Sequence, residues 1–270
     1  MFFMMPTQEE LSNGYDDLKS MFTQWALWHH LAWNNIKQRY RRSTLGPLWL
    51  TISMAIHMLV IGVLFSTLFH TPLQKLLPFL SAGLVFWGLM QGIINEGASA
   101  FLGAASFIMQ VKRPLSLYVA ETVWRNVIIL AHNFVIYIVI AFIFGVVPHK
   151  AVLLLLPLGL LLVILCLSWV AMVFAVISVR YRDFPMIVGN MFTALFWLTP
   201  IMYFPSLLRD KQYLLNFNPF THLLALVRDP LLGQAPPMMS WIIVSAITVV
   251  GWTFALYFFS RFRKRIVYWL

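Results

Sequence analysis

The side chains of this sequence that could do chemistry are a few ionisable groups inside otherwise apolar stretches. They are Glu96, Glu121, Arg125 and His132. Ionisable groups within a membrane are costly, so each is a candidate for a functional site such as a proton relay. Arg125 follows Glu121 by one helical turn and can pair with Glu121 or with Glu96. We favour a charge pair that seats helices over a relay, because Glu96 lies near the inner end of its apolar run and a relay needs carboxylates at mid-depth.

His132 keeps an enzymatic hypothesis open. Membrane acyltransferases also carry a histidine within an apolar helix, although they need a larger bundle to enclose two substrates, and this histidine has no catalytic partner in the sequence around it. The simpler interpretation is a hydrogen bond between helices, worth about 0.6 kcal/mol in a membrane. A membrane-embedded acyl- or glycosyl-transferase of envelope glycan synthesis therefore stays as one hypothesis.

Sequence motifs for nucleotide, metal or hydrolase chemistry are missing. There is no G-x-x-x-x-G-K-[ST], and none of the 13 glycines precedes a lysine, so no phosphate-binding loop of that type holds ATP. H-E-x-x-H, D-x-D and G-x-S-x-G are also missing, and the histidines show no ligand spacing except the adjacent pair His29-His30. We expect no catalytic residue, no metal site and no cofactor in this chain; if ATP and magnesium are used, another subunit binds them.

The composition places these residues in a membrane. The chain has 270 residues, of which 61% are hydrophobic and 10% charged, and its mean hydropathy is +0.81. One soluble core of this length cannot bury so much apolar surface. The formal charge of +10 sits in short clusters beside apolar runs, which favours anionic lipid over nucleic acid as a partner. The only cysteine, Cys166, lies within an apolar run, where packing is its expected role.

Six apolar runs are long enough to span a bilayer, which takes roughly 20 residues. They cover residues 48–69, 78–100, 124–147, 151–179, 186–204 and 240–260. Most Lys and Arg residues fall in the connections on one side, so the positive-inside rule puts that side and both termini in the cytoplasm. The cluster Arg39, Arg41 and Arg42 fixes this orientation, because each Arg costs about 2.5 to 3.5 kcal/mol at the membrane centre. The sequence predicts an all-α integral membrane protein with one transmembrane domain, residues 1–270.

Two segments outside the six-span bundle (48–260) and two segments within it have their own patterns. Residues 18–42 carry apolar side chains every three or four positions, as in an amphipathic helix at the cytoplasmic interface or packed on a soluble partner. Residues 101–123 are too polar to span and predict a cytoplasmic elbow with helical pieces. Residues 205–237 hold only short apolar pieces, so we expect two re-entrant helices there, hinged at an Asn-Pro pair and entering from outside. Residues 261–270 are expected to form a cytoplasmic tail.

Three sequence motifs resemble one family. R-Y-R-R-S-x-L-G-x-x-W starts at Arg39 before the first span, R-Y-R-D starts at Arg180 after the fourth, and N-P-F starts at Asn218 in the outer loop, with Arg228 further on. From about residue 20 to its end, the chain resembles the permease subunits of type-2 ATP-binding-cassette exporters, in the branch that exports O-antigen, capsule or teichoic acid chains. The first two motifs are fairly specific together, whereas the Asn-Pro signal is shared across the wider class.

The resemblance implies a multi-pass protein of the bacterial inner (cytoplasmic) membrane that works as a homodimer. Two copies of a cytoplasmic ABC ATPase would dock below it and bind the ATP and magnesium. The substrate would be a polysaccharide carried on a lipid pyrophosphate, which threads a channel lined by aromatic residues at the dimer interface. No nucleic acid is expected.

Three groups of candidate site residues follow. Arg binds phosphate through a planar fork, so the arginines at headgroup depth are candidates for the lipid pyrophosphate, with topology alone as their other possible role: Arg39, Arg41 and Arg42. Two basic cytoplasmic loops that each hold a proline are candidates for coupling to the ATPase: Lys112, Arg113, Pro114, Arg180, Arg182 and Asp183. The resemblance implies an outer gate at Asn218, Pro219, Phe220 and Arg228.

Overall fold

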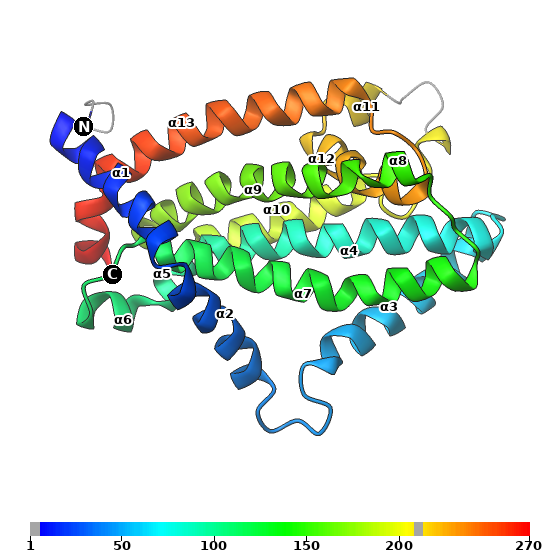
Figure 1. The fold of residues 1–270 in the computed structure, drawn as a ribbon, viewed down its shortest axis with the longest axis horizontal. Helices are drawn as coiled ribbons and strands as arrows, with labels where there is room; N and C mark the ends of the chain where they lie inside the picture. The colour runs from blue at the N-terminus through cyan, green and yellow to red at the C-terminus, as the bar shows by residue number, and fades with distance from the viewer. Residues whose placement is uncertain (1–5, 208–212) are drawn as a thin grey trace.

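The computed structural model describes residues 6–207 and 213–270, and these form a bundle of helices (Figure 1). In chain order the elements are α1 (Gln8–Thr23), α2 (Trp25–Arg39), α3 (Leu48–Leu68), α4 (Leu73–Ala98), α5 (Ala100–Gly103), α6 (Ala105–Gln110), α7 (Ser116–Ile143), α8 (Lys150–Leu153), α9 (Leu155–Arg180), α10 (Phe184–Leu198), α11 (Tyr213–Asn216), α12 (Pro219–Arg228), the 3-10 helix η2 (Asp229–Leu232) and α13 (Met238–Trp269). The predicted all-α class is confirmed for the residues described.

Five of the described helical stretches are long and apolar enough to cross a membrane: α3, α4, α7, Lys150–Arg180 and α13. This confirms a multi-pass membrane protein. The remaining predicted run, 186–204, contains α10, whose 15 residues cover about 22 Å, less than the roughly 30 Å of a hydrocarbon core. The helix ends early because Thr199 precedes Pro200 and is extended (φ −94°, ψ 136°), the conformation that a residue before proline favours. Residues 199–202 continue as buried, non-helical chain.

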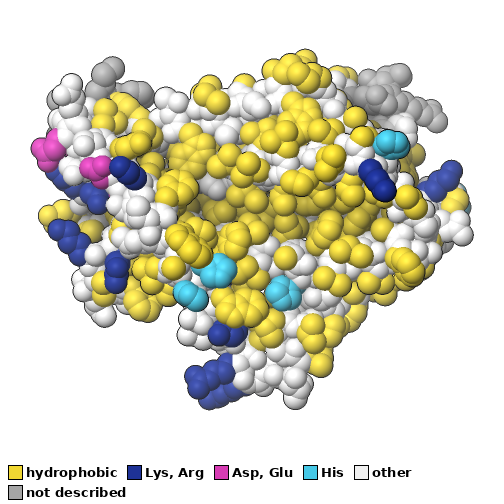
Figure 2. Space-filling view, viewed as in Figure 1, with side chains coloured by type: hydrophobic (Ala, Val, Ile, Leu, Met, Phe, Trp, Pro, Cys, Tyr) yellow, Lys and Arg dark blue, Asp and Glu magenta, His cyan; other side chains and the backbone are white. Residues whose placement is uncertain are grey.

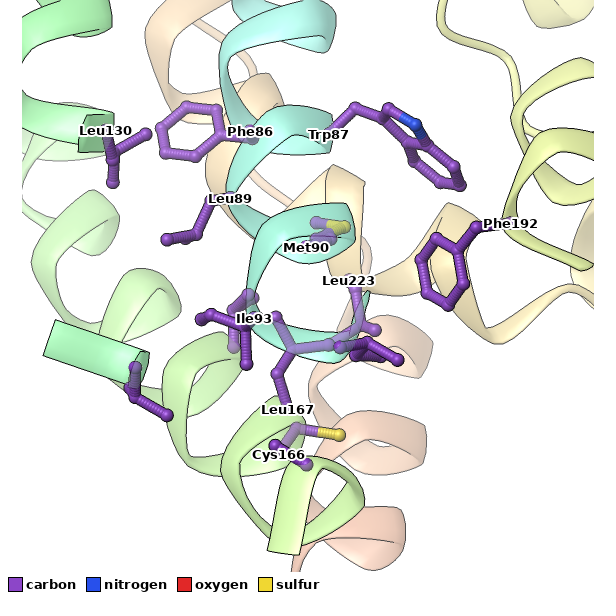
Figure 3. Packing of buried hydrophobic residues seen from close by; sticks show 14 of the residues in the cluster. Phe86, Trp87, Leu89, Met90, Ile93, Leu130, Cys166, Leu167, Phe192 and Leu223 are labelled. Carbon is purple, nitrogen blue, oxygen red and sulfur yellow. The ribbon is translucent and has the colours of Figure 1, made fainter. Parts of the chain in front are cut away.

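Helix α4 forms the centre of the bundle, and 83% of its most apolar 18-residue stretch is buried. It packs against α3, α7, α9, α10 and α12. Figure 3 shows Phe86 directed toward Leu130 of α7, and Trp87 directed toward Phe192 of α10, with ring centroids 5.7 Å apart. A Cβ on Gly97 would collide with the Cβ of Ala171, so glycine there lets α9 approach α4 closely.

The two ends of the bundle differ in what they hold. Helices α1, α5 and α6 and the last turns of α13 lie at one end, on the left in Figure 1, whereas α11 and α12 lie toward the other. Figure 2 shows a broad hydrophobic band across the middle of this face, with Lys and Arg side chains gathered toward its margins. A bilayer would cover such a band, and its headgroups would meet the charges.

The third long helix begins earlier than the sequence suggested. We predicted a span from residue 124 and an elbow over 101–123, but α7 starts at Ser116. The elbow is therefore residues 99–115, and it contains the expected helical pieces, α5 and α6. The hydropathy signal stopped at Glu121 and Arg125, which pair with each other inside the helix and so do not end it.

The helices at both ends of the chain also differ from the predicted bounds. Residues 18–39 belong to two helices, α1 and α2, separated at Gln24, and residues 40–42 lie in the turn that follows. Helix α1 starts at Gln8 with a capping box formed by Thr7 and Glu10. The predicted tail 261–270 continues α13 up to Trp269. It stays helical because Phe262 and Ile266, one turn apart, are both buried.

Residues 205–237, which we predicted to face outside, have a break at the predicted hinge. Helix α11 ends at Asn216 and α12 begins at Pro219, so the chain does break at the Asn-Pro pair. Helix α12 is mostly buried and packs on α4, α9 and α13. Residues 208–212 of the predicted re-entrant segment lie outside the described residues.

Candidate functional site

A cavity of about 750 Å³ lies between α2, the elbow and the adjoining ends of α4 and α7. One wall is a stripe of α2, in which the lining residues recur at i, i+3, i+4 and i+7: Leu31, Asn34, Asn35 and Gln38. The opposite wall includes the small residues Ala100, Gly103 and Ala104, which leave the space open. The charged side chains that line it are Arg39, Glu96, Arg113, Glu121 and Arg125.

Arg125 holds the charged wall together. Its guanidinium contacts Glu96 of α4 (Nη2 to Oε2, 3.0 Å) and Glu121 one turn back on α7 (Nη1 to Oε1, 2.5 Å). Asn126 also donates to Glu96, at 2.9 Å. Arg125 therefore makes both pairings considered from the sequence: the pair with Glu121 lies within α7, and the pair with Glu96 joins α7 to α4. Arg125 is 14% exposed, so this is a largely desolvated pair of contacts rather than a surface one.

Helix α2 joins this network through two side chains. Asn35 donates to Glu121 (Nδ2 to Oε1, 2.9 Å), and Arg39 lies 3.6 Å from Glu96 (Nη2 to Oε1). Sequence reasoning missed Asn35 and Asn126, although the spacing of polar residues along α2 was a signal that could have found the first. Helix α2 is thereby attached to the ends of α4 and α7 that carry Glu96 and Glu121.

The three candidate phosphate-binding arginines do not lie together at one site. Arg39, the last residue of α2, lines the cavity, and its side chain is 54% exposed. Arg41 and Arg42 follow in the exposed turn between α2 and α3, which stands away from the bundle at the bottom of Figure 1. They are not among the residues that line the cavity. Of these three arginines, only Arg39 is therefore placed to meet a ligand in the cavity.

The two candidate coupling loops lie at the same end of the bundle (Figure 1). Lys112, Arg113 and Pro114 form the exposed connection between α6 and α7, and Arg113 also lines the cavity. The second loop packs against the end of α13: the Arg180 guanidinium lies 5.8 Å from the centre of the Trp269 ring, and Arg182 donates to the Leu270 carbonyl at 3.2 Å. Asp183 immediately precedes α10 in the same exposed turn.

The candidate gate residues meet around α12. Asn218 caps the helix by accepting from the Phe220 N–H (3.0 Å), and its amide donates to Thr199 Oγ1 (3.0 Å). Pro219 occupies the first helical turn, where its missing N–H costs nothing. The Phe220 ring packs on Trp87 and on Phe192, with centroids 5.7 and 5.1 Å apart.

Arg228 ties the far end of α12 to the chain that follows α10. Its side chain is buried and donates to the Pro200 carbonyl (Nη1 to O, 2.6 Å). The guanidinium also lies over the Phe79 ring, 4.3 Å from its centre, and contacts Asp229 at 3.5 Å. A buried cation with these partners fixes α12 against residues 199–202 and α4.

His132 lies apart from the Glu96 network. Its Nδ1 is 2.9 Å from the Ile128 carbonyl, and its ring stacks on Trp33 of α2 at a centroid distance of 6.3 Å. Thr51 of α3 donates to the His132 carbonyl at 3.2 Å. These contacts join α2, α3 and α7. The sequence interpretation was a hydrogen bond between helices, whereas the imidazole makes its bond within α7 and meets α2 by stacking.

Comparison with known proteins identifies the family to which this chain belongs. The family model for the ABC-2 type transporter matches residues 26–232. The chain is 27% identical over 238 residues to the O-antigen export system permease protein RfbA of Myxococcus xanthus, covering 86% of this chain and 90% of that protein. A Klebsiella pneumoniae protein with the same description is 21% identical over 196 residues, covering 72% and 76% of the two chains. Since the family model covers more than half of the chain, this protein belongs to the ABC-2 type transporter family.

Proposed function

We propose that this chain is the transmembrane subunit of an ATP-driven ABC exporter that moves a lipid-linked polysaccharide, O-antigen or a similar glycan, across the bacterial inner membrane. The observation that carries the proposal is the similarity to an O-antigen export permease along 86% of the chain. A separate cytoplasmic ATPase binds ATP and magnesium. Two copies of each subunit make up the exporter, as the resemblance to the family implies.

In this proposal the chain crosses the membrane six times. Helix α10 and residues 199–204, of which 199–202 are buried, make the fifth crossing, while α12 and η2 enter from outside and return. The support is that α10 begins near the end that holds α1, whereas α12 lies toward the opposite end (Figure 1). An even number of crossings keeps α1 and the end of α13 together on the cytoplasmic side, where the positive-inside rule puts their basic residues.

The lipid pyrophosphate enters at the cavity beside α2. Three arginines and two glutamates line it, which leaves a surplus of one positive charge. The contact between Arg39 and Glu96 is half exposed and 3.6 Å long, and such pairs contribute about 1 kcal/mol or less. A pyrophosphate diester, with one negative charge on each phosphate, can therefore replace Glu96 as the partner of Arg39 at little cost. Arg41 and Arg42 extend the positive surface along the following turn.

Single Arg to Lys changes at positions 39, 41 and 42 test this entrance. Lysine keeps the charge and the orientation but loses the planar fork. We expect Arg39→Lys to lower export, because that side chain lines the cavity, with insertion and ATPase binding unchanged. Full export in all three variants would remove the phosphate contact and leave the arginines a topological role only.

Reconstitution tests the function as a whole. The chain and the ATPase that co-purifies with it are placed in proteoliposomes, and transfer of a lipid-linked glycan to the far leaflet is followed with ATP. An ATPase variant that cannot hydrolyse ATP is the control. We expect transfer only with the active ATPase. Glycan or acyl transfer by the isolated chain, without the ATPase, would support the transferase hypothesis and overturn the proposal.

A further inference from the structure

The carboxylate of Asp17 joins three segments that are far apart in the sequence. Its side chain is fully buried. One oxygen accepts from the Leu115 N–H (3.1 Å) and from Arg263 Nε (2.7 Å), and the other accepts from the Ser116 N–H (2.9 Å) and lies 2.7 Å from Ser116 Oγ. A single side chain therefore joins helix α1, the start of α7 and the extension of α13 (residues 261–269). We call this set of contacts the Asp17 latch.

The latch supplies something that α7 lacks in its own sequence. The first N–H groups of a helix have no partner within it, and a side chain at the N-cap normally satisfies them. Leu115 occupies that position in α7 and makes no such bond. Asp17 satisfies these donors instead, 98 residues away in the chain, and its charge also suits the positive end of the helix.

Helix α1 is held on α13 along more than this one contact. Glu10 pairs with Arg261 at 3.0 Å, and both side chains are largely buried, whereas the pair of Glu9 with Lys264 at 3.4 Å is exposed and contributes little. Gly14 lies against Ser260 so closely that a Cβ there would collide with the serine side chain. These contacts hold helix α1 on residues 261–269 of α13, and the Asp17 latch ties both to the elbow.

The elbow is the segment on which an ATPase would act under the proposed function. It ends at Leu115, next to Lys112 and Arg113, and it exposes three apolar side chains: Phe107 (65%), Met109 (60%) and Val111 (46%). We propose that Asp17 is a positioning residue that makes the elbow, α7 and α13 move together, so that displacement of the elbow by the ATPase reaches two membrane helices at once. This inference rests on the proposed function, because it assigns the force to the ATPase.

The test in the assembled exporter uses Asp17→Asn, which keeps the shape but removes the charge. We expect normal assembly and ATP hydrolysis within about twofold of the unchanged exporter, while glycan exported per ATP falls roughly fivefold or more, the lower range of coupling between sites. Arg263→Gln should give the same loss, and the double variant should be no worse, because both remove one interaction. Glu9→Gln is the matched control on the same helix, and it should leave the ratio unchanged. An unchanged ratio for Asp17→Asn, even with fewer complexes assembled, would overturn the inference.

A second measurement needs neither substrate nor ATPase. Hydrogen exchange of the full chain in nanodiscs reports whether the amides of Leu115 and Ser116 lose protection in Asp17→Asn. We expect at least tenfold faster exchange there than in Glu9→Gln, and equal rates in the two variants would show that no latch exists. If the unchanged exporter moves no glycan with ATP, the proposed function fails, and the exchange result still decides the latch.

Discussion

Changing Arg125 to glutamine removes the cation that lies between two carboxylates. The side chains of Glu96, Glu121 and Arg125 are 30%, 11% and 14% exposed, so Glu121 would be left with little water around it and Glu96 with only part of its hydration. Breaking a buried pair by removing one partner costs about 3 to 5 kcal/mol. The low end, about 3 kcal/mol, applies here because Asn126, Asn35 and Arg39 still contact the glutamates.

The assay is thermal unfolding of the purified protein in detergent. A loss of about 3 kcal/mol lowers the Tm of a domain of 150–250 residues by roughly 6 to 12 °C. The triple variant with Gln at positions 96, 121 and 125 carries no unpaired charge, so we expect it to recover most of this loss. Lys264→Gln, which breaks an exposed pair, is the control and should change stability by about 0.5 kcal/mol or less. If Arg125→Gln costs less than about 1 kcal/mol, or the triple variant is no better, burial of this pair is not what makes it matter.

Three further outcomes follow from the fold. Cysteines introduced at Ser206 and Gln234 should both react with an impermeant thiol reagent applied outside, because in the proposed topology the segment between them does not cross; labelling of one alone would contradict this topology. Reversing Lys112 and Arg113 to glutamate should lower the ATP hydrolysis that the permease stimulates, and normal hydrolysis and export in that variant would remove the elbow as a docking site. Gly159→Ala would place a Cβ against the backbone of α12 and should cost about 1 to 3 kcal/mol in the same unfolding assay, whereas Gly103→Ala, which meets open space, should not.

Long apolar runs were the part of the fold that the sequence could reveal. Five of the six predicted runs correspond to helices long enough to span, because burial in lipid makes hydropathy the dominant signal. The bounds were less accurate where polar residues pair inside a helix, as at Glu121 and Arg125, or where a proline ends one early, as at Pro200. A hydropathy average depends only on residue types, so it does not include the effect of a partner on another helix.

The candidate site was recovered in part for the same reason. The pairing of Arg125 with Glu121 is local, four residues apart in one helix, so the sequence indicated it. The contacts of Asn35 with Glu121 and of Asp17 with Ser116 join residues 86 and 99 positions apart. Nothing in their immediate sequence indicates these partners, because only the packing of α1 and α2 on α7 brings them into reach.

The length of α13 has a consequence for how the soluble subunits would be held. Its 32 residues make a helix about 48 Å long, whereas the hydrocarbon layer is about 30 Å thick. About 18 Å of helix is therefore more than an upright crossing needs, and its last turns bend away from the long part of the helix, at the end of the bundle that holds α1 (Figure 1). In the proposed exporter this basic part would lie at the cytoplasmic headgroups, between the bilayer and an ATPase bound near the elbow.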